Sequence, residues 1–410
     1  MTQSRHADLP HFPVIDDELV IGGLRLSQLA QQVGRTPFFA YDRRVIDARV
    51  ADLRRVFPAA IKLHYAIKAN PMPAVVAHLA ALVDGLDVAS SGEMRVALDT
   101  GIAPERVSFA GPGKDEGELS QAVAAGILVN VESFRELRLL SAIARRQQRK
   151  ARVAVRVNPD FELKTSGMKM GGGSKQFGID AEDVPRALAE IAQLGLAFEG
   201  FHIFSGSQNL RYEAICEAHT KAFDLALDLA RKARTPPRVV NLGGGLGIPY
   251  FPGEQPLHLA PIAENLATIA ERAAEAIPGA DLVIELGRYL VGEAGLYVCR
   301  ILDRKVSRGH VFLITDGGLH HHLAASGNFG QVLRKNYPVV IGNRVRGAQR
   351  EIASVVGRLC TPLDLLADRM ELSKASEGDL VAIYQSGAYG ATASPSAFLG
   401  HPPPVEIVCG

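Results

Sequence analysis

The chain lacks an excess of charge and lacks long hydrophobic runs. Its 410 residues include 45 Lys and Arg against 44 Asp and Glu, which leaves a net charge of +1. Such a balance indicates neither nucleic acid nor an anionic membrane as a partner. No segment approaches the roughly 20 apolar residues that a membrane span requires, and the N-terminal MTQSRHADLPHF lacks the apolar core of a signal peptide. We therefore expect a cytoplasmic protein.

Cysteine is scarce as well. The chain has four cysteines that are far apart, and their spacing matches neither a disulfide framework nor paired metal ligands: Cys216, Cys299, Cys360 and Cys409. We expect reduced thiols, of which at most one is catalytic. A content of 47% hydrophobic and 22% charged residues is typical of a globular chain of about two or three domains.

Short β-rich runs alternate with longer amphipathic segments from residue 36 onward. The runs are PFFAYD, IKLHYAIKAN, GLDVAS, VSFAGPGK, ILVNVES, ARVAVRVNP, LAFEGFHIFSG, RVVNLGGGLG and DLVIELGR. About eight βα units over about 250 residues fit a TIM barrel, whose active site lies at the C-terminal ends of its strands. A doubly wound open sheet is the alternative, but it would not usually need so many units. We predict an α/β fold with a (β/α)8 barrel over residues 36–285.

The pattern changes after this region. Strand-like runs separated by turn residues replace the long helical patterns: GLYVCRILDRKV, HVFLITDGG, REIASVVGRLC and GDLVAIYQSG. They predict a C-terminal β-barrel or β-sandwich domain over residues 286–410. The N-terminal residues 1–35 are too short for a domain of their own and are expected to join it.

Lys68 lies in HYAIKAN, residues 64–70, at the end of an apolar strand-like run. An isolated lysine at such a place is usually a snorkelling side chain with its ammonium in water. The alternative is a desolvated lysine with a lowered pKa, able to form a Schiff base with an aldehyde such as that of pyridoxal phosphate (PLP). The neighbouring motifs decide between the two interpretations.

Three further motifs lie at predicted strand ends. NLGGGLGIPY, residues 241–250, clusters glycines that allow backbone amides to cradle a phosphate, although a glycine cluster alone is more often a turn. In ELGR, Glu285 could keep a pyridine nitrogen protonated, and Arg288 could donate two hydrogen bonds near the phosphate. GLDVASSGE carries Asp87, Ser90 and Glu93, although acidic residues there are more often helix caps.

These motifs together resemble a known family. HYAIKAN, DVASSGE, GPGK, VRVNP, GSQ, GGGLG, ELGR, DGG, GRLC and GAYG resemble, in this order, the motifs of the fold type III PLP-dependent decarboxylases, which include the diaminopimelate and ornithine decarboxylases. The resemblance spans nearly the whole chain. It implies a PLP-binding barrel like that of alanine racemase, a C-terminal β domain, and a homodimer with active sites shared between subunits.

The matched motifs also imply roles for individual residues. Lys68 resembles the Schiff-base lysine, Glu285 the partner of the pyridine nitrogen, and Cys360 the cysteine that reaches in from the other subunit to protonate the carbanion. Without the resemblance, Cys360 would be read as a small buried hydrophobe. The residues expected to hold the cofactor are Lys68, Asp87, Phe204, Ser207, Gly243, Gly244, Gly245, Glu285, Arg288 and Tyr389.

The chemistry that the resemblance implies is decarboxylation at Cα. A substrate amine would displace Lys68 from the PLP aldehyde, the carboxylate would leave, and Cys360 or Lys68 would supply a proton. Racemases with this barrel usually pair the pyridine nitrogen with arginine, so Glu285 favours a decarboxylase over a racemase. A PLP-binding protein without turnover is a further alternative, but it would need neither Glu285 nor Cys360.

The chain departs from the family where the substrate would bind. Phe204 in HIFSGSQ replaces a histidine that stacks on the cofactor; a phenyl ring can stack but cannot ionise, and His202 is expected to be structural. Thr361 follows Cys360, where Glu or Asp commonly pairs with a distal amine. DGGLHHHLAASGNFG lacks the Arg-Pro pair and the tyrosine of diaminopimelate decarboxylases. Residues expected to contact substrate are Arg156, His320, His321, Thr361 and Asp364.

Free diaminopimelate is therefore not the expected substrate, although a diaminopimelate decarboxylase of lysine biosynthesis stays an alternative. GFHIFSGSQNL and DGGLHHHLAASGNFG resemble a subgroup associated with exosortase and exopolysaccharide loci. Related decarboxylases act on amino acids attached to a carrier protein or another acyl group. We expect a substrate of that kind, because an acyl conjugate needs neither the missing acid nor the missing arginine.

Two further segments carry weaker predictions. The loop ELKTSGMKMGGGSKQ, residues 162–176, could be a mobile lid with lysines for an anionic arm, or an ordinary surface loop. The run of His320, His321 and His322 suggests a metal, but adjacent residues on a strand point to opposite faces, so we expect no metal site and at least one histidine in the substrate pocket.

Overall fold

The structure is a computed structural model that describes residues 6–161, 168–169, 171–331 and 334–410. The chain divides into two compact units. We call Val50–Gly247 with Leu257–Gly287 the barrel unit, and Met1–Arg49 with Ile248–Pro256 and Arg288–Gly410 the β unit. Among the described helices, none is both long enough and apolar enough to cross a membrane.

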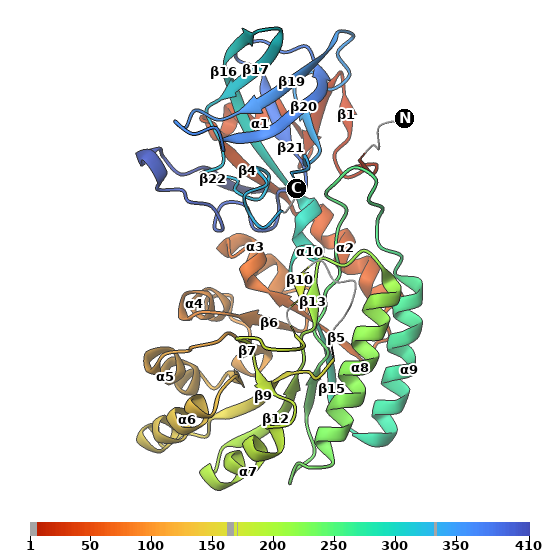
Figure 1. Cartoon of the computed structure of the whole chain (residues 1–410), viewed down its shortest axis with the longest axis vertical. Coiled ribbons are helices and arrows are strands. Elements are labelled where there is room, and N and C mark those ends of the chain that lie inside the picture. The colour runs from red at the N-terminus through yellow and green to blue at the C-terminus, as the bar shows by residue number, and fades with distance from the viewer. Residues whose placement is uncertain (1–5, 162–167, 170, 332–333) are drawn as a thin grey trace. The chain divides into compact units, whose positions relative to one another are not determined.

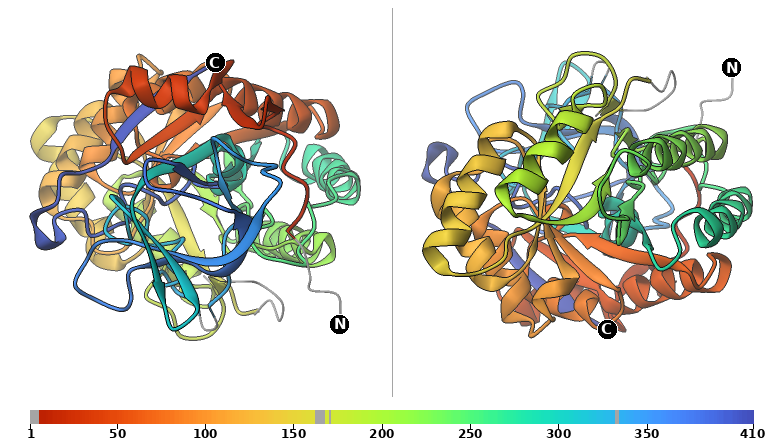
Figure 2. Two further views of the ribbon diagram at one scale, coloured as in Figure 1. Left: turned by 90° about the horizontal axis from the view of Figure 1, so that it is seen from above. Right: turned by 90° about the horizontal axis from the view of Figure 1, so that it is seen from below.

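The barrel unit is built on a closed ring of parallel strands. Among the described residues, eight strands follow one another around the ring, and the last pairs with the first. The strands are β5 (Ile61–Ala66), β6 (Gly85–Val88), β7 (Val107–Phe109), β8 (Leu128–Val131), β9 (Arg152–Asn158), β12 (Ala197–His202), β14 (Val239–Asn241) and β15 (Asp281–Leu286). Figure 2 shows, in its view from below, the ring of strands with helices around it. The predicted TIM barrel is confirmed.

Helices follow the strands and cover the outside of the ring (Figure 1). They are α3 (Pro73–Ala80), α4 (Ser91–Asp99), α5 (Glu116–Ala125), α6 (Phe134–Gln147), α7 (Val184–Leu194), α8 (Tyr212–Ala230) and α9 (Ala260–Ala276), and α2 (Arg43–Val56) runs from the β unit into the barrel unit. The short strands β10 (Met168–Lys169) and β13 (Gly206–Ser207) pair with each other, and β11 (Ile179–Asp180) pairs with β9. The short helices η1 (Ile67–Ala69) and η2 (Pro104–Arg106) complete the unit.

Side chains placed directly after strand ends begin several of these helices. Ser90 accepts a hydrogen bond from the Glu93 amide at the start of α4, and the Glu93 carboxylate accepts one from the Ala89 amide. Asp115 and Glu118 form a capping box on α5. Such caps satisfy amides that have no partner inside the helix. Of the three residues singled out in GLDVASSGE, Ser90 and Glu93 are therefore caps, and Asp87 alone lies on the strand.

The β unit contains two separate sheets. Strands β1 (Val14–Ile15), β2 (Glu18–Ile21) and β3 (Leu24–Arg25) form one, followed by α1 (Leu26–Val33). The larger sheet has the order β18-β21-β16-β17-β19-β20. Its strands are β16 (Gly295–Ser307), β17 (His310–Thr315), β18 (Val339–Ile341), β19 (Arg350–Val356), β20 (Leu365–Ser373) and β21 (Leu380–Ile383). The predicted separate β domain is confirmed. The unit also contains α10 (Arg288–Val291), η3 (Gly292–Ala294) and η4 (Phe398–Gly400).

One predicted barrel strand belongs elsewhere. The run PFFAYD contains β4 (Phe38–Asp42), which pairs with β16 and with β22 (Val405–Cys409) of the β unit. The expected boundary at residue 36 is therefore wrong, since residues up to Arg49 belong to the β unit. All five residues of β4 are buried. A strand buried on both faces fits the middle of either sheet, so its sequence does not reveal its partner.

Candidate active site

Lys68 lies in η1, directly after β5, at the C-terminal end of the barrel strands. Its Nζ lies 5.8 Å from the centre of the Phe204 ring, which follows β12. The Lys68 side chain is exposed, so the desolvation expected from the sequence is not supplied by the surrounding protein. What the position does provide is an accessible amine beside an aromatic ring.

Glu285 lies on β15 with its carboxylate inside the barrel. Its Oε2 accepts a hydrogen bond from Asn241 Nδ2 at 3.0 Å and lies 2.9 Å from Nε2 of His202. Burial alone would raise the pKa of Glu285, but the close approach of His202, together with the positive charges of Lys68 and Arg156, outweighs burial and lowers that pKa. The carboxylate is therefore an anion at neutral pH.

Asp87, on β6, belongs to a second buried polar group. Its Oδ1 accepts a hydrogen bond from Ser108 Oγ at 2.6 Å and lies 3.0 Å from His64 Nδ1. Asn130 donates to Ser108 at 3.2 Å. The other oxygen, Asp87 Oδ2, is buried without a hydrogen-bond partner among the described residues. A buried carboxylate oxygen without a donor is ready to accept one from a ligand.

The glycine loop after β14 is held at both ends. The Gly243 amide donates to Asn241 Oδ1 at 2.8 Å, and Gly243 has a left-handed φ of 77°. A Cβ on Gly244 would collide with the carbonyl oxygen of Glu285, and one on Gly245 would lie 2.8 Å from the carbonyl oxygen of Gly206. Side chains are thus excluded, and the loop presents backbone to its surroundings. Ser207, the next residue after Gly206, also lies on β13.

Arg156 is buried on β9 and pairs with Glu132. Its Nη1 lies 2.8 Å from Glu132 Oε1, and its guanidinium lies 4.9 Å from the ring centre of Phe177. Charge from Arg156 and Lys114 overcomes burial and lowers the pKa of Glu132. Arg156 is therefore engaged by a buried carboxylate, and its expected contact with substrate stays a prediction.

Sequence reasoning missed several of these residues. His64, Ser108 and Asn130 surround Asp87, while Asn241 contacts Glu285. A signal was available, because each lies on a barrel strand at a position where the inward-facing residue is usually a bulky aliphatic. His202 was expected to be structural, yet it contacts Glu285 directly.

The β unit holds the predicted residues Arg288 and Tyr389. Arg288 Nη1 donates to the Tyr250 hydroxyl at 2.9 Å, and its guanidinium lies 4.7 Å from the centre of the Tyr389 ring. Tyr389 has a φ of 53°, in the left-handed region that costs a non-glycine residue about 1 kcal/mol or more and recurs at functional sites. Their predicted role at a phosphate stays a prediction.

Cys360 and Thr361 lie in the turn between β19 and β20 of the β unit. Cys360 is exposed, so the alternative interpretation as a buried hydrophobe is wrong. The Thr361 hydroxyl accepts a hydrogen bond from the Leu363 amide at 3.3 Å. Both oxygens of Asp364 are taken by backbone amides, Leu319 at 2.7 Å and Leu359 at 2.9 Å. Asp364 thus fastens two loops, and its expected contact with substrate stays a prediction.

The three consecutive histidines lie in a turn after β17, not on a strand as expected. His320 and His321 stack with ring centres 3.7 Å apart, His321 lies 2.9 Å from the Pro402 carbonyl oxygen, and His322 lies 2.9 Å from Ser386 Oγ. Nowhere in the described ranges do three or more His, Cys, Asp or Glu side chains gather so that they could hold a metal ion.

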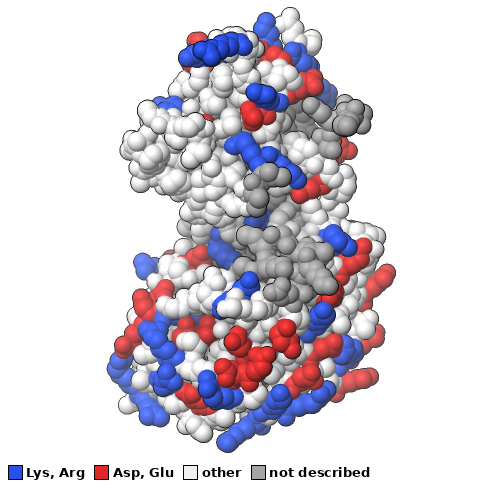
Figure 3. All heavy atoms as spheres, viewed as in Figure 1, with Lys and Arg blue, Asp and Glu red and all other residues white. Residues whose placement is uncertain are grey.

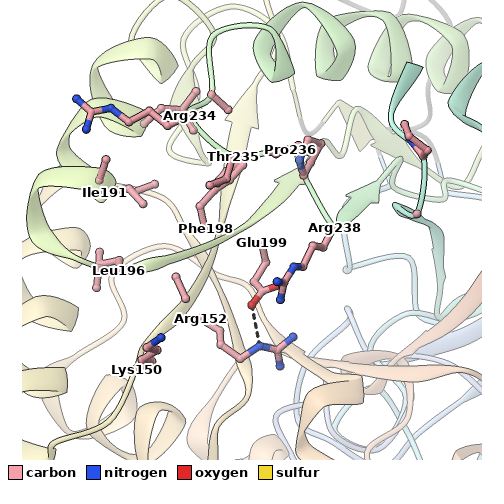
Figure 4. Close-up of a pocket in the computed structure, with 17 residues that line it drawn as sticks. Lys150, Arg152, Ile191, Leu196, Phe198, Glu199, Arg234, Thr235, Pro236 and Arg238 are labelled. Atoms are coloured by element: carbon pink, nitrogen blue, oxygen red, sulfur yellow. Dashed lines mark hydrogen bonds and ion pairs between the residues drawn. The ribbon is translucent and has the colours of Figure 1, made fainter. Parts of the chain in front are cut away.

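A groove of about 900 Å³ lies away from these residues. It is lined by the first residues of β9, β12 and β14 and so lies at the N-terminal end of the barrel. Figure 4 shows Arg152 and Arg238 beside Glu199 in this groove. Arg152 Nε lies 3.2 Å from the Glu199 carboxylate. Catalytic residues of TIM barrels lie at the other end, where Lys68 and Glu285 are found.

Comparison with known proteins identifies the family. Residues 43–292 match the family model described as pyridoxal-dependent decarboxylase, pyridoxal binding domain. The chain belongs to this family of decarboxylases. It is a PLP-dependent enzyme, and the fold type III assignment from its motifs is confirmed.

Individual relatives cover most of the chain. The decarboxylase is 38% identical to L-glutamyl-[BtrI acyl-carrier protein] decarboxylase from Niallia circulans, over 91% of this chain and 88% of the relative. It is 34% identical to the diaminopimelate decarboxylase of Aquifex aeolicus, over 93% of this chain and 88% of that enzyme. The crystal structure of diaminopimelate decarboxylase from M. jannaschii in complex with L-lysine matches with a TM-score of 0.88 and 25% identity, over 98% and 93% of the two chains.

The described residues of the barrel unit fit PLP. Gly243, Gly244 and Gly245 leave only backbone beside a phosphate, since a Cβ on Gly244 would meet the Glu285 carbonyl. Glu285 offers an anion to a protonated ring nitrogen, and Asp87 Oδ2 is a buried acceptor without a partner among the described residues. When bound, the pyridine ring of PLP accepts the electron pair that is released when the substrate loses its carboxylate.

Proposed function

We propose that this decarboxylase acts on an amino acid whose distal end is conjugated, most directly an aminoacyl group on a carrier protein. The observation that carries the proposal is the lack of an acidic side chain directly after Cys360, where the family commonly has Glu or Asp for a distal amine. Thr361 is neutral, and burial, with the neighbouring His321, His401 and Arg358, lowers the pKa of His320 to about 3. Burial is also the main cause that lowers the pKa of His321 to about 4.

Electrostatics explains why this matters. At neutral pH His320 and His321 carry no charge, and both oxygens of Asp364 are engaged by amides. A free distal ammonium brought among such groups would lose its hydration beside the like charge of Arg358. A thioester or amide has no charge to compensate. The similarity to a decarboxylase named for a glutamyl-carrier substrate supports the same class.

The residue roles proposed for the reaction follow the matched motifs. Lys68 would hold the cofactor through its amine, at the place that the amine of the substrate would later take. Glu285, as an anion, holds a proton on the ring nitrogen. Cys360 or Lys68 delivers a proton to Cα after the carboxylate has left.

A substrate panel tests the proposal. Release of CO₂ is measured for PLP-loaded protein with free meso-diaminopimelate, lysine, ornithine, arginine and glutamate. It is then measured with L-glutamate joined to a carrier protein as a thioester of its side-chain carboxyl, which leaves the α-carboxylate free, and Lys68→Ala is the blank. We expect turnover of the conjugate only. The variant Thr361→Asp restores a carboxylate and should raise the rate with free diamino acids. Efficient turnover of a free diamino acid by the unchanged protein would overturn the proposal.

Decarboxylation of free diaminopimelate is the second candidate, because 34% identity to the enzyme of Aquifex aeolicus extends over nearly the whole chain. This reaction requires a charged partner for the distal end of the substrate, and Thr361 is neutral.

Membership of the exosortase-associated subgroup stays a prediction. It is tested by asking whether the carrier that serves as substrate is encoded beside exopolysaccharide genes.

A further inference from the structure

The carboxylate of Glu285 has two protein neighbours that come from adjacent strands. His202 is the last residue of β12 and Asn241 the last residue of β14, and the two are paired in register. Both approach the same oxygen: Nε2 of His202 lies 2.9 Å from Oε2, and Nδ2 of Asn241 donates to it at 3.0 Å. Among the described residues, both of these contacts are to Oε2, and none of the described hydrogen bonds is made to the other oxygen, Oε1. His202 is 1% exposed and Asn241 is 6% exposed.

We propose that His202 is a positioning residue that, together with Asn241, holds Glu285 as an anion with its second oxygen turned to the ring nitrogen of the cofactor. The inference rests on the proposed role of Glu285. His202 would act only through that carboxylate, so it is not itself a catalytic residue.

Burial gives the first argument. A carboxylate inside a protein takes up a proton unless donors or positive charge compensate for the lost water. A protonated Glu285 could not keep a proton on the ring nitrogen. His202, whose Nε2 lies 2.9 Å from Oε2, is the neighbour that most strongly offsets the burial of Glu285. The other charged or titratable groups that face it are Lys68, Arg156 and His64, of which His64 lies on the paired strand β5.

The orientation of Asn241 gives the second argument. Its amide nitrogen donates to Glu285, and its amide oxygen accepts the Gly243 amide at 2.8 Å. A rotated amide would face the carboxylate with oxygen and the Gly243 amide with nitrogen, so only one orientation satisfies both. One side chain therefore links the carboxylate to the glycine loop. Because His202 and Asn241 both approach Oε2, the position of this oxygen is fixed by two neighbours.

The test measures the proton on the cofactor directly. Wild type, His202→Phe, His202→Gln and Glu285→Gln are loaded with PLP labelled with nitrogen-15 in the ring, and the nitrogen-15 chemical shift reports protonation. The exposed His258 supplies a matched His258→Phe control in the barrel unit. We expect a protonated ring in wild type and control, and loss of the proton in His202→Phe with a fall in kcat of about ten- to a hundredfold, as for other lost supporting contacts. His202→Gln should recover part of both.

The outcomes separate the two proposals. If Glu285→Gln leaves the ring protonated, the assignment of Glu285 is wrong. If Glu285→Gln removes the proton but folded His202→Phe does not, only the role of His202 is overturned. If His202→Phe does not fold, His202→Gln and Asn241→Ala are compared with wild type instead. The inference is contradicted if both variants keep the wild-type chemical shift and the wild-type kcat across pH.

Discussion

At the scale of single residues, the interior of this barrel is unusually polar. TIM barrels normally fill their interior with layers of Val, Ile and Leu. Here His64, Asp87, Ser108 and Asn130 form one hydrogen-bonded group, and Arg156 belongs to another. Each of these groups is costly to bury unless it is paired. The polar interior therefore indicates a barrel whose stability is partly exchanged for a binding site.

Lys68→Ala should remove activity without harming the fold. The side chain is exposed, and surface changes away from special contacts usually alter stability by no more than about 0.5 kcal/mol. We expect loss of the absorbance of covalently held PLP and loss of CO₂ release, with a melting temperature close to that of wild type. Retained turnover in Lys68→Ala would contradict the assignment of this lysine.

The His64–Asp87 pair should make stability depend on pH. Burial alone lowers the pKa of His64, but the charge and hydrogen bond of Asp87, with Glu285 and Asp84, raise it above its ordinary value of 6.5. Because the folded pKa is the higher one, the protonated pair stabilises the fold fully below the unfolded pKa, and this stabilisation is lost as pH rises through the folded pKa.

Urea unfolding of wild type and His64→Gln at about pH 6 and about pH 9 tests this linkage. The stability advantage of wild type should be larger at the lower pH, since ionisations shared by both proteins cancel in the difference. An advantage that grows as pH rises would show that His64 is held in its neutral form.

At the scale of elements, Gly244 tests the loop after β14. A Cβ there would collide with the carbonyl oxygen of Glu285 on β15, and overpacking of this kind costs about 1–3 kcal/mol or more. We expect Gly244→Ala to lower both the melting temperature and the affinity for PLP. In Gly92→Ala the nearest atom lies at 3.7 Å, in ordinary contact, so this control in α4 should be neutral or slightly stabilising.

Elements were predictable from sequence where local pattern and position agree. Eight of the nine predicted barrel runs form the strands of the ring, because buried β-branched runs alternate there with helical segments. PFFAYD was wrongly assigned to the barrel, because the sequence of a strand buried on both faces does not indicate which strand it pairs with. The turn at His320 was expected to be a strand because its contacts come from distant parts of the chain, such as His401, and cannot be read from the local sequence.

The candidate site was predictable from sequence only in part. Motifs at strand ends pointed to Lys68, Glu285 and the glycine loop as candidate residues, whereas the side chains that contact Glu285 were not predicted. Asn241 and His202 meet Glu285 only because β12, β14 and β15 are neighbours in the ring. The predicted lid at residues 162–176 lies partly outside the described residues, because residues 162–167, which include Lys164, and residue 170 are not described.

At the scale of the whole molecule, charge gives no preferred partner. Basic and acidic side chains are interspersed over the surface of the barrel unit that Figure 3 shows, in keeping with the net charge of +1. A homodimer with Cys360 acting in the active site of the other subunit is the family-based prediction. Cys360 is exposed in the chain, as a residue that acts on a second copy must be.

Subunit mixing tests this prediction. Lys68→Ala and Cys360→Ala homodimers should each be inactive or strongly impaired. Random exchange of equal amounts should give half heterodimers, each with one intact site, so activity should recover to about a quarter of wild type if Cys360 acts in trans. Mixtures that stay as inactive as their components, despite demonstrated subunit exchange, would refute a shared site.

The most direct test of the central claim compares one aminoacyl group in two forms. Initial rates of CO₂ release are measured for free L-glutamate and for L-glutamate joined to a carrier protein as a thioester of its side-chain carboxyl, with meso-diaminopimelate as reference. We expect kcat/KM for the thioester to exceed that of either free amino acid by about a hundredfold or more, because only the conjugate has no charged distal end to be buried in the site. A kcat/KM for free meso-diaminopimelate equal to or above that of the thioester would contradict it.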